Sequence, residues 1–138
     1  MTFDCTFCGI VAGTSPAEMV TETDLALAFV NQNPANPGHM LVIPKRHADD
    51  IWELSREDGE AVWALVRDVA DLARRAYEPD GLNLFQANRR AGWQSEFHFH
   101  VHVVPRWDGD PLVPNWGRLV GDPEDVAAMG DRLRASLI

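Results

Sequence analysis

The stretch EFHFHVHVVPR, Glu96 to Arg106, places a histidine at every second position from His98 to His102. Successive side chains of a β-strand point to opposite faces, so the residues of such a segment divide into two sets. Phenylalanine and valine, which favour strands, alternate with the histidines and can seal a core on one side. The pattern predicts a strand with one apolar face and one face that carries His98, His100 and His102.

Imidazoles clustered on one strand face are typical of two kinds of site. Histidine is a common metal ligand, and its neutral ring is also a nucleophile near neutral pH. A single histidine would more often be structural, whereas a cluster favours metal binding or phosphate chemistry. One hypothesis is therefore a metal-dependent hydrolase with His98, His100 and His102 on one ion, and the other is phosphate chemistry at a histidine.

The chain has 138 residues, about the size of one domain, and 46% of them are hydrophobic, which is enough for a core. We therefore treat residues 1–138 as a single domain. The net charge of −9 argues against nucleic acid as a partner, because a phosphate backbone requires a basic face. No apolar run is long enough to span a membrane, and the first residues do not resemble a secretory signal. We expect a cytoplasmic protein without a membrane partner.

The remaining patterns predict an α+β fold with one long and two shorter helices. A short helix over 5–12 should end at Gly13. The long helix should begin at Ser55, a typical capping residue, and run to about Tyr77, and the last helix should follow Asp122. Strands are predicted at 19–23, 25–31, 39–44 and 82–88, with the histidine segment as the fifth. Hairpin-like links join these strands, so the five-stranded sheet should be mainly antiparallel.

Several segments together resemble one protein family. HFHVHVV fits the pattern His-φ-His-φ-His-φ-φ, where φ is apolar, and is similar to the signature of the histidine triad (HIT) family of nucleotide hydrolases and transferases. LAFVNQNPANPGHMLVIPKRH is similar to the family's other signature block and GWQSEF to its phosphate loop, and with CTFC these segments cover most of residues 5 to 107. The resemblance implies a homodimer in which two five-stranded sheets join across the interface. Pairing between chains would also cover an edge of this small sheet.

The resemblance implies that His100 is the nucleophile and that His102 contacts the α-phosphate. His100 is also the middle histidine, whose neighbours can donate to phosphate oxygens. In the implied reaction His100 displaces the leaving group of a nucleoside phosphoramidate or a dinucleoside polyphosphate, and water then releases the nucleoside monophosphate. A backbone carbonyl near His98 would accept a hydrogen bond from the other ring nitrogen of His100. No step requires a catalytic metal.

The resemblance also identifies residues that would bind the nucleotide. Asn31 would contact the ribose hydroxyls, and His39 would lie near the phosphates. Polar side chains of the phosphate loop would donate to phosphate and leaving-group oxygens, namely Asn88, Gln94 and Ser95. Apolar side chains would enclose the base, which we expect to be a purine, namely Phe7, Ile10 and Phe29. The alternative interpretations are plain core packing for the apolar residues, ordinary loop polarity for those of the phosphate loop, and a solvent-exposed turn for His39.

The phosphate loop departs from the family pattern. Trp93 replaces the glycine that usually precedes the glutamine, and Arg89 and Arg90 stand where the loop is usually small. Glu96 replaces a small apolar residue two positions before His98. These changes bear on the conformation of the loop and on the preferred leaving group. Trp93 could stack on a leaving group or cover a dimer surface.

Cys5 and Cys8 form a C-x-x-C motif near a predicted helix start. Four-coordinate zinc would need two more ligands, usually histidines, and His47 and His98 are the candidates. The resemblance supports this set, because zinc-bearing members of the family use these positions. Such a closed site would be structural, since it has no open position at which to activate water. A redox motif, which here lacks a preceding strand, and two free cysteines without a metal are the alternatives.

Two further functions follow from the same residues. A nucleotide-binding regulator would bind a monophosphate but never form a covalent adduct, although the chain retains the histidine that catalysis requires. A phosphorylase is disfavoured, because phosphorylases of this family tend to carry Gly-Gly-Ser where this chain has Gly92, Trp93, Gln94 and Ser95. The leading interpretation of the sequence is a nucleotidyl hydrolase.

Overall fold

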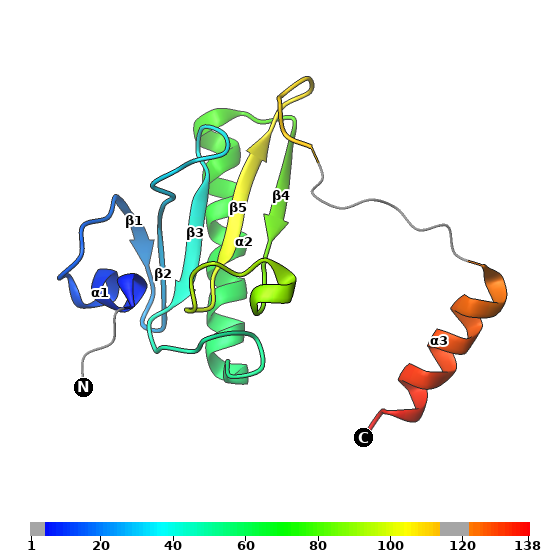
Figure 1. Ribbon diagram of the computed structural model, residues 1–138. Coiled ribbons are helices and arrows are strands. Elements are labelled where there is room, and N and C mark those ends of the chain that lie inside the picture. Colours follow the sequence, from blue (N-terminus) through cyan, green and yellow to red (C-terminus); the bar gives the residue numbers. More distant parts are fainter. Residues whose placement is uncertain (1–4, 114–121) are drawn as a thin grey trace.

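The computed structural model describes residues 5–113 and 122–138, which form a five-stranded sheet and three α-helices (Figure 1). The helices are α1 (Thr6–Ala12), α2 (Arg56–Tyr77) and α3 (Pro123–Ala135), and a short 3-10 helix, η1, spans Arg90–Gly92. The strands are β1 (Met19–Glu22), β2 (Ala26–Val30), β3 (Met40–Pro44), β4 (Gly81–Phe85) and β5 (Val101–Arg106). Neighbouring strands are antiparallel in the order β1-β2-β3-β5-β4, which confirms the predicted α+β class.

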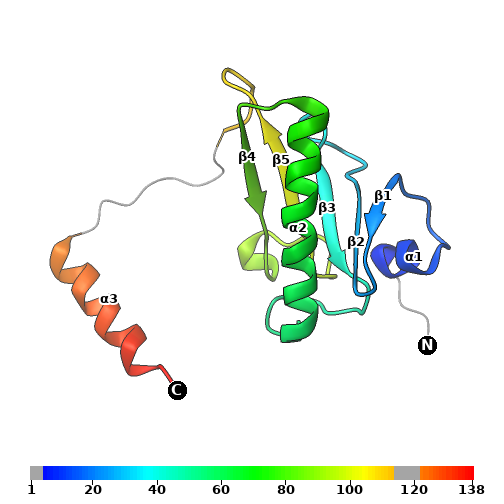
Figure 2. The same ribbon diagram turned by 180° about the vertical axis from the view of Figure 1, so that it is seen from behind.

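The two faces of the sheet pack against different helices. Figure 2 shows α2 lying along one face, with α1 beside β1 and β2. Alternate residues of β2 and β3 contribute to the two cores. The core beneath α2 contains Ala26, Ala28, Met40 and Val42. The core beneath α1 contains Leu27, Phe29, Leu41 and Ile43. This division explains why every residue of β3 is buried.

The helix α2 begins at the residue that the sequence predicts. The Ser55 side chain accepts a hydrogen bond from the backbone N–H of Asp58 at 3.1 Å, which satisfies a donor that the helix start would leave unpaired. The Asp58 carboxylate also lies 2.9 Å from Arg46, so the helix start is bound to the segment after β3. Buried residues recur at three- and four-residue steps, as one apolar face requires; they are Val62, Leu65, Val66 and Val69.

The strand at the histidines is shorter than predicted. β5 begins at Val101, so His102 alone of the three histidines lies within it. The preceding residues leave the sheet because the Phe99 N–H donates to the carbonyl of Ala48, at 2.7 Å, instead of to a neighbouring strand. Phe99 and Val101 are buried as expected, whereas Phe97, predicted to face the core, is 46% exposed. The side chains therefore still alternate near β5, but the strand itself does not extend over all the histidines.

The helix α3 starts after Asp122, whose side chain accepts a hydrogen bond from the Glu124 N–H at 2.9 Å. It lies apart from the sheet in both ribbon views. Its apolar side chains are exposed, including Val126, Met129 and Leu133. None of the helices in the described ranges is long and apolar enough to cross a membrane.

Candidate active site and metal centre

Most of the predicted site residues gather on the α1 side of the sheet, around a pocket of about 760 Å³. β5 places His102 opposite Leu41 of β3, and Leu41 packs beneath α1, so the imidazole lies on this side. One wall of the pocket is apolar and includes Phe7, Ile10 and Phe29. The other wall includes Ser95, His100 and His102. The pocket thus joins the predicted base-binding and phosphate-binding residues.

His100 is buried, and a backbone contact orients its ring. Its Nδ1–H donates to the carbonyl of His98 at 2.8 Å, as the resemblance implies. With the proton on Nδ1, the Nε2 atom carries the free electron pair. Burial lowers the pKa of His100, against opposing effects of the His98 carbonyl and the Glu96 carboxylate. The imidazole is therefore neutral near pH 7, which is the form that a nucleophile requires.

His102 is oriented by a second histidine. The Ala35 N–H donates to Nδ1 of His39 at 2.9 Å, so the proton of His39 is on Nε2. That Nε2–H donates in turn to Nδ1 of His102, also at 2.9 Å. The proton of His102 is therefore on Nε2, and His102 borders the pocket. The ring can donate a hydrogen bond to an anionic group beside His100.

Both of these rings are kept neutral by their surroundings. Burial, followed by the nearby His100 and His39 rings, lowers the pKa of His102 to about 4. Burial also lowers the pKa of His39. Near neutral pH neither ring gains a proton. The Ala35 N–H therefore continues to donate to His39, and His39 continues to donate to His102. His39 does not border the pocket as His102 does, and it would act on a ligand through His102.

The apolar wall has the residues that the resemblance implies. Phe7 and Phe29 are buried, with ring centroids 5.4 Å apart in an edge-to-face arrangement. Leu41, which the sequence does not single out, borders the same pocket. Asn31 follows β2 on the rim, and its Oδ1 accepts the Asn33 N–H at 2.9 Å. Its amide nitrogen lies 3.3 Å from Nε2 of His39 and is the polar atom of this side chain that could also meet a ligand hydroxyl.

Gln94 lies behind the pocket wall, where it supports the phosphate loop. It is 5% exposed, and its Oε1 accepts the Arg89 N–H at 2.6 Å. Its amide nitrogen donates to the backbone carbonyls of Asp49 and Glu96. Among the residues that the structure describes, Ser95 borders the pocket and Gln94 does not. Direct binding of a substrate by Gln94 stays a prediction.

Asn88 also lies outside the pocket lining. Its Oδ1 accepts the Ile51 N–H at 2.8 Å, and its Nδ2 donates to the Gln86 side chain at 2.6 Å. These bonds connect the start of the phosphate loop to the segment before α2. β4 ends at Phe85, earlier than the sequence predicts. A substrate contact by Asn88 is likewise a prediction that stays open to test.

Two of the departures in the phosphate loop, Arg89 and Trp93, lie where the backbone has a positive φ. Arg89 has a φ of 63° and Trp93 a φ of 70°, a region in which glycine has no steric penalty and other residues do. The Arg89 guanidinium contacts the Asp50 carboxylate at 2.9 Å and lies 4.7 Å from the centre of the Trp52 ring. Contacts of the arginine side chain thus help to stabilise a conformation that glycine would adopt freely.

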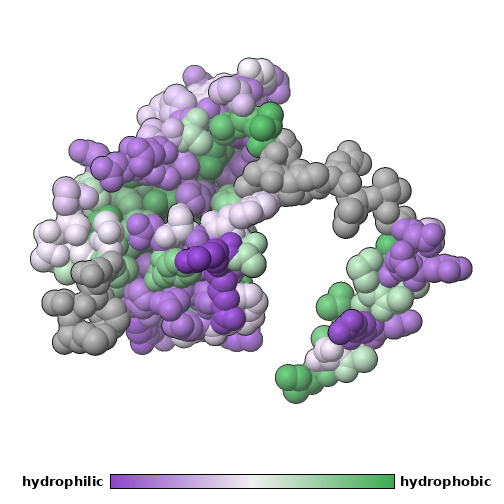
Figure 3. All heavy atoms as spheres, in the orientation of Figure 1, coloured by the Kyte–Doolittle hydropathy of each residue, from purple (hydrophilic) through white to green (hydrophobic). Residues whose placement is uncertain are grey.

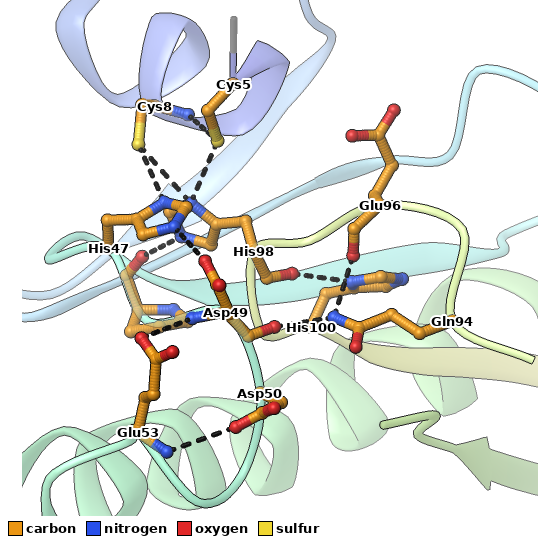
Figure 4. A network of polar contacts seen from close by, with 11 residues as sticks. Cys5, Cys8, His47, Asp49, Asp50, Glu53, Gln94, Glu96, His98 and His100 are labelled. Carbon is orange, nitrogen blue, oxygen red and sulfur yellow. Dashed lines mark hydrogen bonds and ion pairs between the residues drawn. The ribbon is translucent and has the colours of Figure 1, made fainter. Parts of the chain in front are cut away.

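Beside the cluster formed by His100, His102 and His39 lies a second cluster, which joins α1 to the loop before β5 (Figure 4). Cys5, Cys8, His47 and His98 each place one potential ligand atom within 4.8 Å of the others. The Cys8 Sγ atom is 3.2 Å from Nδ1 of His47, and the Cys5 Sγ atom is 3.4 Å from Nδ1 of His98. Zinc bonds of about 2.3 Å to sulfur and about 2.0 Å to nitrogen, at tetrahedral angles, separate these atoms by about 3.5 Å. The four residues therefore form a possible metal site.

Each histidine of this cluster directs an unprotonated nitrogen at the sulfur atoms. The Nε2–H of His98 donates to the Pro44 carbonyl at 2.8 Å, and the Nε2–H of His47 donates to the Asp49 carboxylate at 2.6 Å. Metal-binding histidines commonly have such a partner on the second nitrogen. The donor set therefore fits zinc in chemistry as well as in distance. The sequence does not single out Asp49, because no motif distinguishes it from other acidic residues.

Comparisons with known proteins agree with this geometry. The family model described as HIT domain matches residues 12–109. A Bacillus subtilis protein named protein hit is 36% identical over 126 residues, which are 89% of this chain and 87% of that protein. A Schizosaccharomyces pombe protein named adenosine 5'-monophosphoramidase hnt1 is 35% identical over 134 residues, which are 96% of this chain and 98% of that protein.

Solved structures match over nearly the whole chain. A HIT family member from Bacillus subtilis has a TM-score of 0.90 and 33% identity, and the match covers 99% of both chains. A zinc-bound histidine triad family protein from Mycobacterium smegmatis has a TM-score of 0.75 and 34% identity, and the match covers 96% of this chain and 98% of that chain.

Proposed function

Because this chain belongs to the HIT family, we propose that it is a hydrolase of nucleotides that reacts through a covalent nucleotidyl-histidine. Its substrates would be nucleoside phosphoramidates or dinucleoside polyphosphates, with a purine base in the apolar wall. The observation that supports this most is the protonation of the two rings: His100 has a free Nε2, and His102 has an Nε2–H, at one pocket. The phosphoramidase name of the Schizosaccharomyces pombe relative is consistent with it.

The proposed reaction has two displacements at the α-phosphorus. Nε2 of His100 forms a bond to phosphorus, and the bond to the leaving nitrogen or oxygen breaks with its electron pair. Water then attacks the same phosphorus, which releases the nucleoside monophosphate and frees Nε2. His102 would donate its Nε2–H to a non-bridging oxygen in both steps, and Ser95 could donate its hydroxyl. The Nδ1 bond to the His98 carbonyl would stabilise the charged imidazole of the intermediate.

We propose that the second cluster binds structural zinc through Cys5, Cys8, His47 and His98. Bound zinc would link α1, which carries part of the apolar wall, to the residues before β5, and no chemical step would pass through it. The three-histidine metal hydrolase is disfavoured by the ring orientations. The unprotonated nitrogen of His98 faces the cysteines, whereas that of His100 is the atom left for the pocket.

We also propose a homodimer. β4 is one of the two edge strands of the sheet, and its Leu84 is 41% exposed. Trp63 of α2 and Trp93 of the phosphate loop are also exposed, at 62% and 52%. Figure 3 shows further hydrophobic side chains exposed on α3. A second copy that pairs with β4 would cover a sheet edge and apolar side chains next to it.

The proposed mechanism is tested by trapping the intermediate. The protein would be mixed with an adenosine phosphoramidate, quenched in acid-free denaturant and analysed by peptide mass spectrometry. We expect a nucleotidyl adduct on His100 in the wild type and none in His100→Ala, with turnover lowered by several powers of ten. His102→Ala is the matched control, because it should slow turnover while the adduct still forms. Turnover of His100→Ala at nearly the wild-type rate would contradict the proposal.

A further inference from the structure

The phosphate loop brings to the pocket a group that the proposed reaction does not require, the carboxylate of Glu96. Glu96 borders the same wall as Ser95, His100 and His102. It is partly buried, and Figure 4 shows its carboxylate pointing away from Gln94. Within the described ranges, no cation or hydrogen-bond donor pairs with this carboxylate. Its charge therefore acts on the neighbouring His100 ring and on the molecule that occupies the pocket.

The rest of the pocket does not offset this negative charge. Among the described residues, no lysine or arginine borders the pocket, whereas Glu18 does so in addition to Glu96. The Arg89 guanidinium, near in sequence, contacts Asp50. His100 and His102 offer the pocket ring nitrogens that can accept or donate a hydrogen bond, in place of a fixed positive charge. A nucleoside monophosphate can still bind through such bonds, but a polyphosphate leaving group would meet no compensating cation among the described residues that border the pocket.

From this charge balance we infer that the pocket selects leaving groups by charge, and that Glu96 is the residue that determines the selection. The preferred substrates are nucleoside phosphoramidates in which the leaving amine carries a positively charged group elsewhere in its structure. Anionic leaving groups such as nucleoside polyphosphates are disfavoured. The inference rests on the proposed function. In the selected reaction the P–N bond breaks, its electron pair stays on the amine nitrogen, and that nitrogen takes a proton from water.

The size of the effect follows from Coulomb's law at a partly exposed site. At a separation of about 7 Å and an effective dielectric constant of about 60, one charge pair changes a rate constant about fourfold. A cationic and an anionic leaving group differ by two charges. Glu96 should therefore contribute roughly tenfold to the ratio of their kcat/KM values, and salt should reduce that contribution.

The test uses adenosine monophosphate phosphoramidates of pentylamine, 1,5-diaminopentane and 5-aminopentanoate. Their leaving groups have similar length and are neutral, cationic and anionic. We expect the wild type to prefer the cationic over the anionic compound about tenfold or more, with a smaller preference at about 0.5 M salt. Glu96→Gln should lower this ratio about tenfold. The control Glu22→Gln removes the same charge from a residue that contacts Lys45 outside the pocket, and it should leave the ratio unchanged.

Glu96→Val restores the apolar character usual in the family. It provides a second measurement of the ratio that does not depend on hydrogen bonds formed by a glutamine amide in the loop. An equal ratio in wild type, Glu96→Gln and Glu96→Val, with the His100 adduct still formed, would overturn the inference and leave the proposed function standing. Absence of both hydrolysis and adduct with all the compounds would overturn the two together. A lower ratio in both variants and not in Glu22→Gln would support the selection by Glu96.

Discussion

Replacement of Asp49 by alanine should weaken zinc binding although Asp49 is not a ligand. The Asp49 carboxylate accepts the Nε2–H of His47 at 2.6 Å. This bond keeps the proton away from Nδ1, the nitrogen that lies 3.2 Å from the Cys8 sulfur. Without the acceptor, the His47 ring can rotate or exchange its proton between the two nitrogens, and both changes remove a ligand atom from the cluster.

The expected magnitude follows from this contact and its exposure. Loss of such a partner weakens metal binding about 10- to 100-fold, or about 1.4–2.7 kcal/mol. The Asp49 side chain is 48% exposed and that of His47 26%, so water can replace part of the lost bond. We therefore expect Asp49→Ala to weaken zinc binding about 10- to 30-fold. At a fixed concentration of free zinc the free energy of unfolding falls by a similar amount, and Tm by roughly 3–8 °C.

The measurement is competition for zinc with a chromophoric chelator, together with thermal unfolding at buffered free zinc. Asp49→Asn is the matched control, because its side-chain oxygen can still accept the His47 proton, and it should retain most of the affinity. In metal-free protein, Asp49→Ala and wild type should differ much less in Tm than they do in zinc. Equal zinc affinity in Asp49→Ala and wild type would refute the argument.

Four further outcomes are expected. Cys8→Ser should lose bound zinc and lower Tm but retain measurable activity, and brief chelator treatment of the wild type should not stop turnover; elemental analysis and rates check both. His39→Phe removes the donor to Nδ1 of His102 and should lower kcat/KM about tenfold without preventing the His100 adduct. The lowered pKa of His102, about 4, gives stability that is present above the unfolded value of about 6.5 and lost as pH falls through about 4. His102→Gln should therefore flatten the fall of Tm over that range, and an unchanged pH profile would contradict the cause given.

The local signals of the sequence predict the elements well where one residue decides the conformation. Ser55 caps α2, and Gly13, with a φ of 78°, ends α1. Both act through contacts within a few residues, which a sequence pattern contains. The alternation before β5 is a weaker guide, because pairing with Ala48, distant in sequence, determines where the strand begins. A period of two thus predicts the faces of side chains better than the length of a strand.

The same distinction separates the parts of the site that the sequence predicts from those it does not. Residue type and spacing single out Cys5 and Cys8 as candidate zinc ligands, and the resemblance to the family supports His98 as their partner. The structure brings the three side chains together in a possible metal site. Gln94 is polar and lies in the phosphate loop, yet its amide is occupied by backbone groups of Asp49 and Glu96. A polar residue in a loop can serve a ligand or the loop itself, and only the positions of its neighbours decide between these roles.

His98 links the two clusters through different atoms, and this explains why metal and nucleophile should be separable by experiment. Its ring lies among the potential zinc ligands, while its carbonyl accepts the Nδ1–H of His100 at 2.8 Å. Loss of metal can displace this carbonyl, but it removes no group that reacts. A neutral hydrogen bond contributes about 0.5–1.5 kcal/mol, so misorientation of His100 would slow turnover about 2- to 13-fold. Removal of His100 itself eliminates the covalent path and should cost several powers of ten. The size of the loss of turnover on removal of the metal therefore distinguishes a structural metal from a catalytic one.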